Sequence, residues 1–276
     1  MRSIILGVFA ALAISSPTTA ADRVLSVGGS VTEIVYALGE GDRLVARDST
    51  SSFPEAASGL PDVGYMRALA PEGVLSVNPD LIIAEEGSGP PETINVLREA
   101  QIDFVTIPDG FSAEAVGIKI ESVAKALGVE EKGKELADNT LLAIKAAALG
   151  ARREDRKRVM FVLSTRGGRI LASGKNTAAD GIISLAGGTN AIGGFEGYKL
   201  LTDEAVIEAA PDVILMMDRG GDHSMADNDL FAMPSIAGTP AAETRSVLRM
   251  NGLFLLGFGP RTGEAITALN RALYGA

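Results

Sequence analysis

Short apolar segments alternate with amphipathic ones along the first half of the chain. The apolar, β-prone segments are expected to form strands over residues 23–27, 43–47, 80–84 and 103–107. Segments with helical spacing follow them, from Ser30 or Thr32 through Leu38 and over 71–77, 91–101 and 112–127. Nearly continuous apolar strands that alternate with helices predict a parallel sheet covered by helices on both faces.

A long helical segment then interrupts this alternation. Residues 129–153 are rich in Ala, Leu, Lys and Glu and contain no Pro. They predict one helix of about 22 residues, which would be roughly 33 Å long. Because a helix of this length is a stiff spacer, residues 128–153 are expected to join two lobes rigidly.

The alternation of strands and helices starts again after Lys157. We expect strands over 158–164, 169–173 and 212–217, helices over 177–186 and 203–209, and a final strand followed by a helix within 252–275. The predicted fold class is α/β, with two Rossmann-like lobes that each hold a central, mostly parallel sheet. The lobes are expected over 21–127 and 154–276, with a ligand cleft between them beside the carboxyl ends of the strands.

One stretch of the chain occurs twice. Residues 64–84 (GYMRALAPEGVLSVNPDLIIA) and 197–215 (GYKLLTDEAVIEAAPDVIL) both begin with Gly-Tyr and end in Pro-Asp and an apolar segment. Each copy has a glutamate at the head of a short helix, Glu72 or Glu204. The helix dipole favours a negative charge there, which explains each glutamate locally. Their repetition in two similar lobes also predicts a two-point contact with a basic partner.

The N-terminal segment has the layout of a secretory signal peptide. Arg2 precedes an apolar run from Ile4 to Ile14, and small residues lead to Ala20, after which cleavage is expected. The apolar run is too short to span a bilayer as a mature helix, and no charged stop-transfer segment follows it to favour the alternative of an N-terminal anchor. The mature chain is therefore expected to be exported without membrane insertion, as a monomer.

Composition excludes several kinds of site. The chain has no Cys and one His, so it offers neither thiolate ligands nor the usual zinc sites built from several histidines. A formal net charge of −10 makes nucleic acid and anionic membrane surfaces poor partners.

The segment 257–263 (GFGPRTG) is similar to a dinucleotide-binding loop, but Pro260 and Arg261 stand where the backbone should curve around a pyrophosphate. A tight helix entry is the preferred interpretation. An exported α/β enzyme that binds a nucleotide there stays an alternative. A hydrolase would depend on His223, with no serine placed beside it.

Several segments together resemble one known class of protein. The signal peptide, two α/β lobes, linking helix and paired acidic helix tips resemble the periplasmic substrate-binding proteins for vitamin B12, siderophores and haem. The resemblance covers 23–275, and its haem-binding subgroup is similar in VGYMRALAPEGVLS, SVGGSVTEIVYALG, GKNTAADGIISLAGGTNA, YKLLTDEAVIEAAPDVIL and FGPRTGEAI. It implies a periplasmic protein, not an enzyme, that carries ferric haem to an ABC permease and its ATPase. A ferric siderophore or a corrinoid stays an alternative ligand.

The resemblance also implies a set of site residues. It assigns the iron to Tyr65, and phenolate is one of the known protein ligands of haem iron. Arg67 would stabilise the phenolate or bind a haem propionate, and Arg47 and Arg219 are further candidates for the cleft.

Some members of the subgroup use a His from the second lobe, near the start of the second Gly-Tyr copy. This chain has Tyr198 there and no His. Tyr198 and His223 are therefore secondary candidates for the haem site, although a loop His such as His223 is more often a surface residue. The resemblance assigns Glu72 and Glu204 to permease docking.

Overall fold

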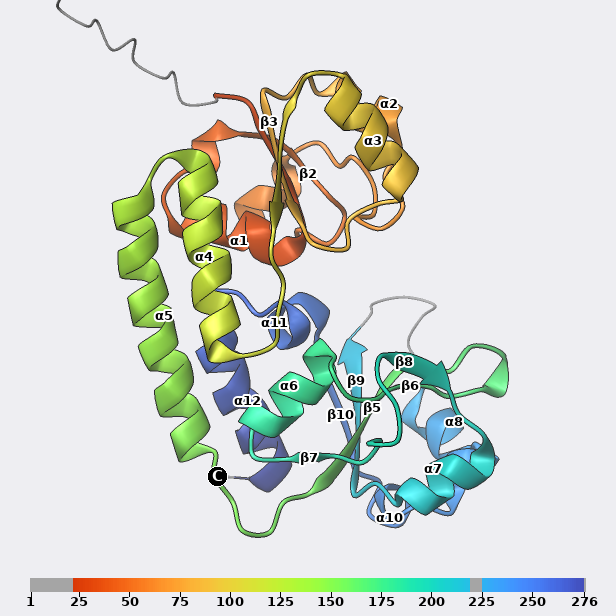
Figure 1. Ribbon diagram of the computed structural model, residues 1–276. Helices are drawn as coiled ribbons and strands as arrows, with labels where there is room; N and C mark the ends of the chain where they lie inside the picture. The colour runs from red at the N-terminus through yellow and green to blue at the C-terminus, as the bar shows by residue number, and fades with distance from the viewer. Residues whose placement is uncertain (1–21, 219–224, 276) are drawn as a thin grey trace, which may run out of the picture.

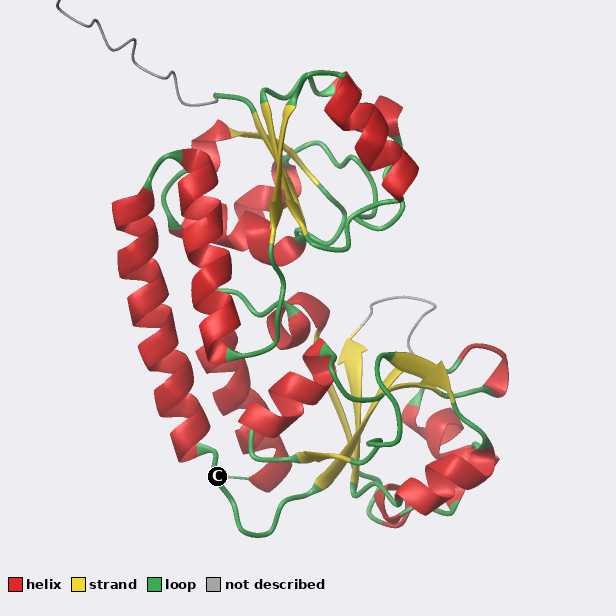
Figure 2. Cartoon of the chain, in the orientation of Figure 1, coloured by secondary structure: helices red, strands yellow, loops and turns green. Residues whose placement is uncertain are grey.

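The computed structural model describes residues 22–218 and 225–275, which form two α/β lobes at the two ends of a long helix (Figure 1). Figure 2 shows a separate sheet in each lobe, with helices packed around both. The α/β fold class with two lobes is confirmed. The domain boundaries at residues 128 and 154 stay predictions.

The N-terminal lobe holds an all-parallel sheet with the strand order β2-β1-β3-β4. Its strands are β1 (Val24–Val27), β2 (Leu44–Arg47), β3 (Leu81–Glu85) and β4 (Asp103–Ile107). Its helices are α1 (Gly29–Ala37), α2 (Pro71–Ser76), α3 (Pro91–Glu99) and α4 (Ala113–Leu127). These elements lie where the alternation of apolar and amphipathic segments predicts them.

The C-terminal lobe holds a mixed sheet with the order β10-β9-β5-β6-β8, and β7 also pairs with β5. Its strands are β5 (Arg158–Ser164), β6 (Leu171–Ser173), β7 (Thr189–Asn190), β8 (Tyr198–Leu200), β9 (Val213–Asp218) and β10 (Val247–Asn251). Only β6 runs antiparallel to its neighbours β5 and β8. The helices are α6 (Ala178–Leu185), α7 (Asp203–Ala209), α8 (Asp227–Ala232), α9 (Pro234–Ala237), α10 (Pro240–Glu243), α11 (Gly252–Leu256) and α12 (Thr262–Tyr274).

The final strand expected at the start of 252–275 is wrong. Gly252–Leu256 is the helix α11, and the strand β10 ends just before it. The Asn251 side chain accepts a hydrogen bond from the backbone N–H of Phe254 at 3.0 Å and so caps the helix. A short apolar run fits a buried strand and a buried helix equally well, and the cap decides between them here.

The long helix α5 (Glu130–Gly150) is packed along its length rather than free in solvent. It contacts α4 in the N-terminal lobe and α12 in the C-terminal lobe (Figure 1). The contact with α4 is close, because a Cβ atom at Gly133 would lie 2.2 Å from the Cβ atom of Ala124. α5 therefore holds both lobes by side-chain packing as well as by chain connectivity.

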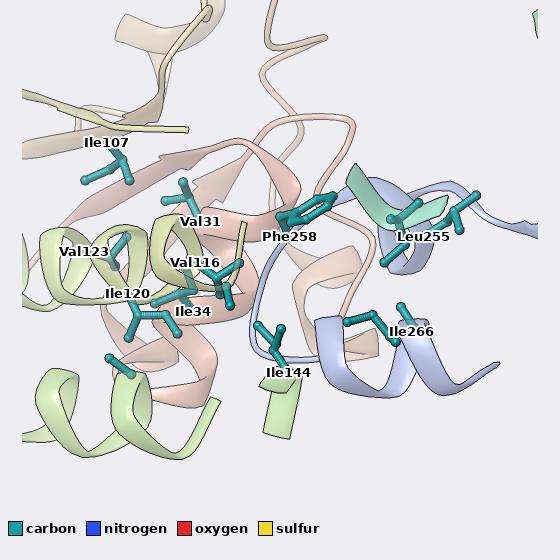
Figure 3. Close-up of a cluster of buried hydrophobic side chains, with 14 of the residues drawn as sticks. Val31, Ile34, Ile107, Val116, Ile120, Val123, Ile144, Leu255, Phe258 and Ile266 are labelled. Carbon is teal, nitrogen blue, oxygen red and sulfur yellow. The ribbon is translucent and has the colours of Figure 1, made fainter. Parts of the chain in front are cut away.

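One hydrophobic core runs from the first lobe into the second. Val31 and Ile120 of the N-terminal lobe belong to the same buried cluster as Ile144 of α5 and Phe258 and Ile266 of the C-terminal lobe (Figure 3). Two further buried clusters each lie within a single lobe. Among the described residues, no helix combines the length and apolarity needed to cross a membrane.

Candidate functional site

Tyr65 and Arg67 lie together in the loop between β2 and α2. Tyr65 is 45% exposed and Arg67 is also exposed, whereas Met66 and Leu69 are buried in the core of the lobe. The buried side chains anchor the loop and turn Tyr65 and Arg67 outward. Arg67 Nη1 donates a hydrogen bond to the Tyr65 hydroxyl oxygen at 2.9 Å. A guanidinium at this distance stabilises negative charge on a phenolic oxygen.

Arg47 holds this loop in place. Its Nη1 donates to Asp62 Oδ2 at 2.7 Å and to the carbonyl oxygen of Asp48 at 3.0 Å. Asp62 in turn accepts a hydrogen bond from the N–H of Gly64, at a positive φ of 103°, just before Tyr65. Arg47 therefore stabilises the loop through Nη1, which binds Asp62 and the backbone of Asp48.

Tyr198 lies in the strand β8 of the second lobe. It is 39% exposed, and its ring meets that of Phe161 edge-on, with centroids 6.5 Å apart. Ser173 is its cross-strand partner in β6. Burial raises the pKa of Tyr198, against the opposing effects of hydrogen bonds to Thr177 and Ser173 and of the charge of Arg67. The hydroxyl end of Tyr198 thus lies among hydroxyls of its own lobe.

Arg67 connects the residues of the two lobes electrostatically. Partial burial acts to lower its pKa, but the hydrogen bond to Tyr65 and the charges of Tyr65 and Glu85 outweigh this, so the pKa of Arg67 is raised. Tyr198 adds to the same effect from the second lobe. The structure therefore joins Tyr65 to Arg67 by a hydrogen bond, and the charge of Arg67 also acts on Tyr198 of the second lobe.

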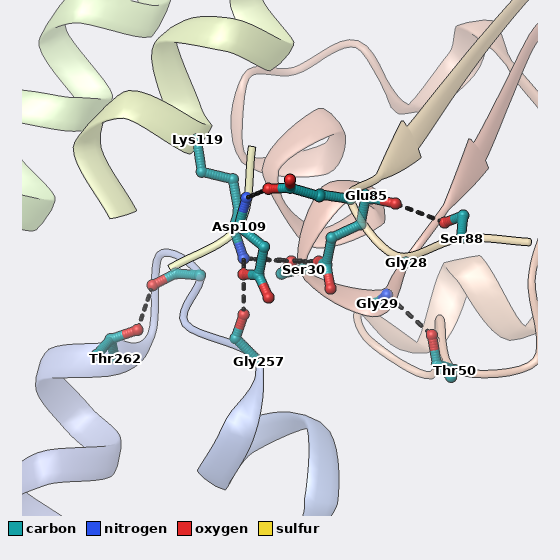
Figure 4. Close-up of polar contacts among 12 residues, drawn as sticks. Gly28, Gly29, Ser30, Thr50, Glu85, Ser88, Asp109, Lys119, Gly257 and Thr262 are labelled. Carbon is teal, nitrogen blue, oxygen red and sulfur yellow. Dashed lines mark hydrogen bonds and ion pairs between the residues drawn. The ribbon is translucent and has the colours of Figure 1, made fainter. Parts of the chain in front are cut away.

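Glu85, at the end of β3, belongs to a polar network that the sequence analysis did not identify (Figure 4). The fully buried Lys119 lies 2.6 Å from Asp109 Oδ1 and 3.5 Å from Glu85 Oε2 through its Nζ atom. Nζ also donates to the Ser30 hydroxyl at 3.1 Å and, across the lobes, to the Gly257 carbonyl at 3.3 Å. Burial raises the pKa of Glu85, although Lys119 opposes this. In the sequence, this network could have been suspected from Lys119, a lysine among the apolar positions of α4.

The glycine-rich segment 257–263 contacts the first lobe through Arg261. The Arg261 guanidinium binds both carboxylate oxygens of Glu33, at 3.0 and 2.8 Å, and lies 3.5 Å from the centre of the Phe53 ring. The backbone N–H of Arg261 also donates to Glu33 at 3.3 Å. A protein carboxylate therefore lies at this helix entry, where a nucleotide phosphate would have to bind, and the geometry favours the helix-entry interpretation.

Two further predicted residues, Glu72 and Glu204, begin short helices at the surface. Glu72 and Glu204 are exposed in the first turns of α2 and α7. The pKa of Glu204 is lowered by hydrogen bonds to its own backbone N–H and to Thr202. Arg219 and His223 lie in 219–224, outside the described residues.

Two α/β lobes on one packed helix, with the charge of Arg67 in one lobe acting on Tyr198 in the other, are the architecture of a two-lobed ligand-binding protein. The chain belongs to the periplasmic binding protein family, which it matches over residues 24–252. It is 30% identical over 71% of its length to the uncharacterised ABC transporter substrate-binding lipoprotein YvrC of Bacillus subtilis (strain 168), and the match spans 63% of that lipoprotein. It is 27% identical to the vitamin B12-binding protein of Yersinia pestis (strain Pestoides F), over 80% of this chain and 77% of that protein.

Solved structures of periplasmic heme-binding proteins are similar over nearly the whole chain. BhuT in complex with two hemes is 42% identical, with a TM-score of 0.85 over 91% of this chain and 97% of that one. RhuT from Roseiflexus sp. RS-1, in apo form, is 39% identical, with a TM-score of 0.88 over 92% and 98%. HutB of Vibrio cholerae is 31% identical, with a TM-score of 0.80 over 91% and 98%.

Proposed function

We propose that the chain is a periplasmic substrate-binding protein that captures ferric haem between its lobes and delivers it to an ABC permease. The observation that carries this proposal is the exposed residue Tyr65, whose hydroxyl lies 2.9 Å from Nη1 of Arg67. A tyrosine is one of the known axial ligands of haem iron, and an adjacent cation favours its phenolate form. The likeness to heme-binding proteins at 39% and 42% identity supports the same ligand.

The proposal gives the other residues distinct roles. Tyr65 binds the iron and Arg67 stabilises the phenolate, while Arg219 and His223 stay candidates for the second lobe. Arg47 acts through the loop, since its guanidinium already binds Asp62 and the backbone of Asp48. No residue has a catalytic role, because transport requires capture and release without chemistry on the ligand.

A hemin titration of the purified, exported protein tests this function. The Soret band is expected to shift saturably, because axial ligation changes the electronic surroundings of the iron. A corrinoid stays the second candidate, since a vitamin B12-binding protein is a 27% identical relative. Titration with cobalamin in parallel separates the two, and a saturable response to cobalamin alone would remove haem. Ferric siderophores would be tested next if neither ligand bound.

Tyr198 is proposed to contact the face of the ligand rather than its iron. Its hydroxyl is engaged by Thr177 and Ser173, and burial raises its pKa, which disfavours the phenolate that ferric iron requires. The residue remains 39% exposed. An aromatic ring so placed packs well against a flat macrocycle.

Substitutions of Tyr198 separate these two roles. Tyr198→Phe is expected to keep the hemin affinity and the ligand spectrum, because the ring remains. Tyr198→Ala is expected to weaken hemin binding about tenfold, the upper range for an aromatic contact. Absorbance titrations of both variants give the affinities. A changed charge-transfer band in Tyr198→Phe would instead assign the hydroxyl to the iron.

The proposed partner is an inner-membrane ABC permease with its ATPase, reached from the periplasm by a monomeric binding protein. Glu72 and Glu204 are proposed as the two docking residues. Both are exposed at helix starts, one in each lobe, and basic residues of the permease would pair with them. Residues 1–20 are proposed as the signal peptide that directs the export.

A further inference from the structure

The repeated sequence segments have the same three-dimensional surroundings in both lobes. Asp80, which follows the Pro of the first copy, accepts a hydrogen bond from the backbone N–H of Arg23 at 3.2 Å. Asp212, at the same place in the second copy, accepts one from the N–H of Arg158 at 2.7 Å. Arg23 immediately precedes β1, and Arg158 begins β5. The Pro-Asp pair therefore ties each copy to the first strand of its lobe.

The same two arginines also hold the ends of α2 and α7. The Arg23 guanidinium donates to the carbonyl oxygens of Asn78 and Val77, each at 2.7 Å. The Arg158 guanidinium donates twice to the carbonyl oxygen of Ala209, at 3.0 and 2.7 Å. A cation at the C-terminal end of a helix satisfies its free carbonyls and complements its dipole. The duplicated arginines thus present α2 and α7 in equivalent ways.

The outer faces of α2 and α7 match position by position. Val74 and Val206 are both fully buried, and the next residues, Leu75 and Ile207, are 39% and 44% exposed. Leu75 lies three residues after Glu72, and Ile207 lies three residues after Glu204. Residues three apart in a helix are neighbours on its surface. Each lobe therefore presents a carboxylate beside a large, exposed aliphatic side chain.

The two tips lie on the same side of the molecule, away from α5 (Figure 1). A single exposed Leu or Ile needs no explanation, because soluble proteins carry many. Here the exposure recurs at matched positions, next to a matched negative charge, on helices held by matched arginines. Two equivalent contact sites are expected to bind a partner that has two copies of the same surface. Since each site pairs a carboxylate with an apolar side chain, the complementary surface of the partner should pair a basic group with an apolar one.

We propose that Leu75 and Ile207 form the apolar half of the two permease contacts, each packing into the permease beside the basic residue that binds the neighbouring glutamate. This proposal rests on the proposed transport function and extends its docking surface from two charges to two charge-and-aliphatic pairs. The apolar members lose water-exposed surface on docking, whereas the glutamates steer and orient the encounter. Buried apolar anchors at the centre of an interface commonly carry much of the affinity.

The test measures binding to the haem permease–ATPase complex of the same bacterium in lipid nanodiscs. Leu75→Ser and Ile207→Ser are each expected to weaken binding about tenfold, and the double variant more than either. Leu142→Ser is the matched control, because Leu142 is 67% exposed on α5, away from α2 and α7. It should bind the permease like the unchanged protein.

Hemin titration of the same variants separates the two proposals. Unchanged hemin binding with weakened permease binding supports the apolar contacts. The apolar contacts would be refuted if the Leu75→Ser/Ile207→Ser double variant bound the permease as tightly as the unchanged protein. A Glu72→Ala/Glu204→Ala variant measures the contribution of the charges alone. Failure of the unchanged protein to bind hemin would refute the transport function itself, and failure to bind the permease would refute both contacts.

Discussion

Tyr65→Phe is expected to abolish the long-wavelength charge-transfer band of the hemin complex and to weaken hemin binding by about a hundredfold or more. The substitution removes one oxygen atom and keeps the ring, so the loop anchored by Met66 and Leu69 keeps its fold. Loss of a group that supports a metal ligand already costs about 10- to 100-fold, and loss of the ligand itself should cost at least as much. Absorbance titration measures both effects.

Two companion variants interpret that result. Tyr198→Phe removes a hydroxyl from the other lobe and should leave the spectrum unchanged. Arg67→Ala removes the donor 2.9 Å from the Tyr65 hydroxyl and should weaken the phenolate ligation without abolishing it. A charge-transfer band that persists in Tyr65→Phe would show that another residue binds the iron, and Tyr198 and His223 would be substituted next.

Lys119→Ala is expected to reduce the free energy of unfolding by about 3 kcal/mol, because it leaves two partly buried carboxylates without their buried cation. Nζ lies 2.6 Å from Asp109 and 3.5 Å from Glu85, and the side chain is fully buried. The change also removes the hydrogen bond to Gly257 in the other lobe. Urea unfolding followed by circular dichroism measures the loss.

A surface lysine and a compensated variant serve as controls. Lys134 forms an exposed pair with Asp138 at 2.6 Å, and Lys134→Ala should leave the free energy of unfolding nearly unchanged. Adding Glu85→Gln and Asp109→Asn to Lys119→Met should recover part of the stability, because the unpaired charges are then gone. Equal losses in Lys119→Ala and Lys134→Ala would contradict the assignment of the buried network.

Local patterns in the sequence were sufficient to predict much of the fold. The parallel strands of the first lobe and the helix α4 follow from apolar period and capping, since the Ser112 side chain accepts from the Ala115 N–H and Gly128 ends the helix with a positive φ of 72°. The helix α11 was missed because its five residues are too few to show a period. The strand β8, which pairs with the antiparallel strand β6, was missed because its three residues are too few to show an alternation.

The candidate site was predictable where it is local and not where it is distant. Tyr65 and Arg67 are two residues apart, so their contact follows from a short loop. The Lys119 network joins α4 to residues up to 138 positions away, and no pattern in a single sequence encodes such a separation. The hydrogen bond from Arg47 to Asp62 likewise depends on how the loop after β2 returns to the end of that strand.

The core that both lobes share links the unfolding of one lobe to that of the other. Val31 and Ile266 belong to one buried cluster, and the ion pair between Glu33 and Arg261 crosses the same boundary. A lobe cut away from its neighbour would expose half of that cluster to water and leave the Glu33 carboxylate without its cation. The two lobes therefore share one cooperative unit of stability, and neither should retain its native packing without the other.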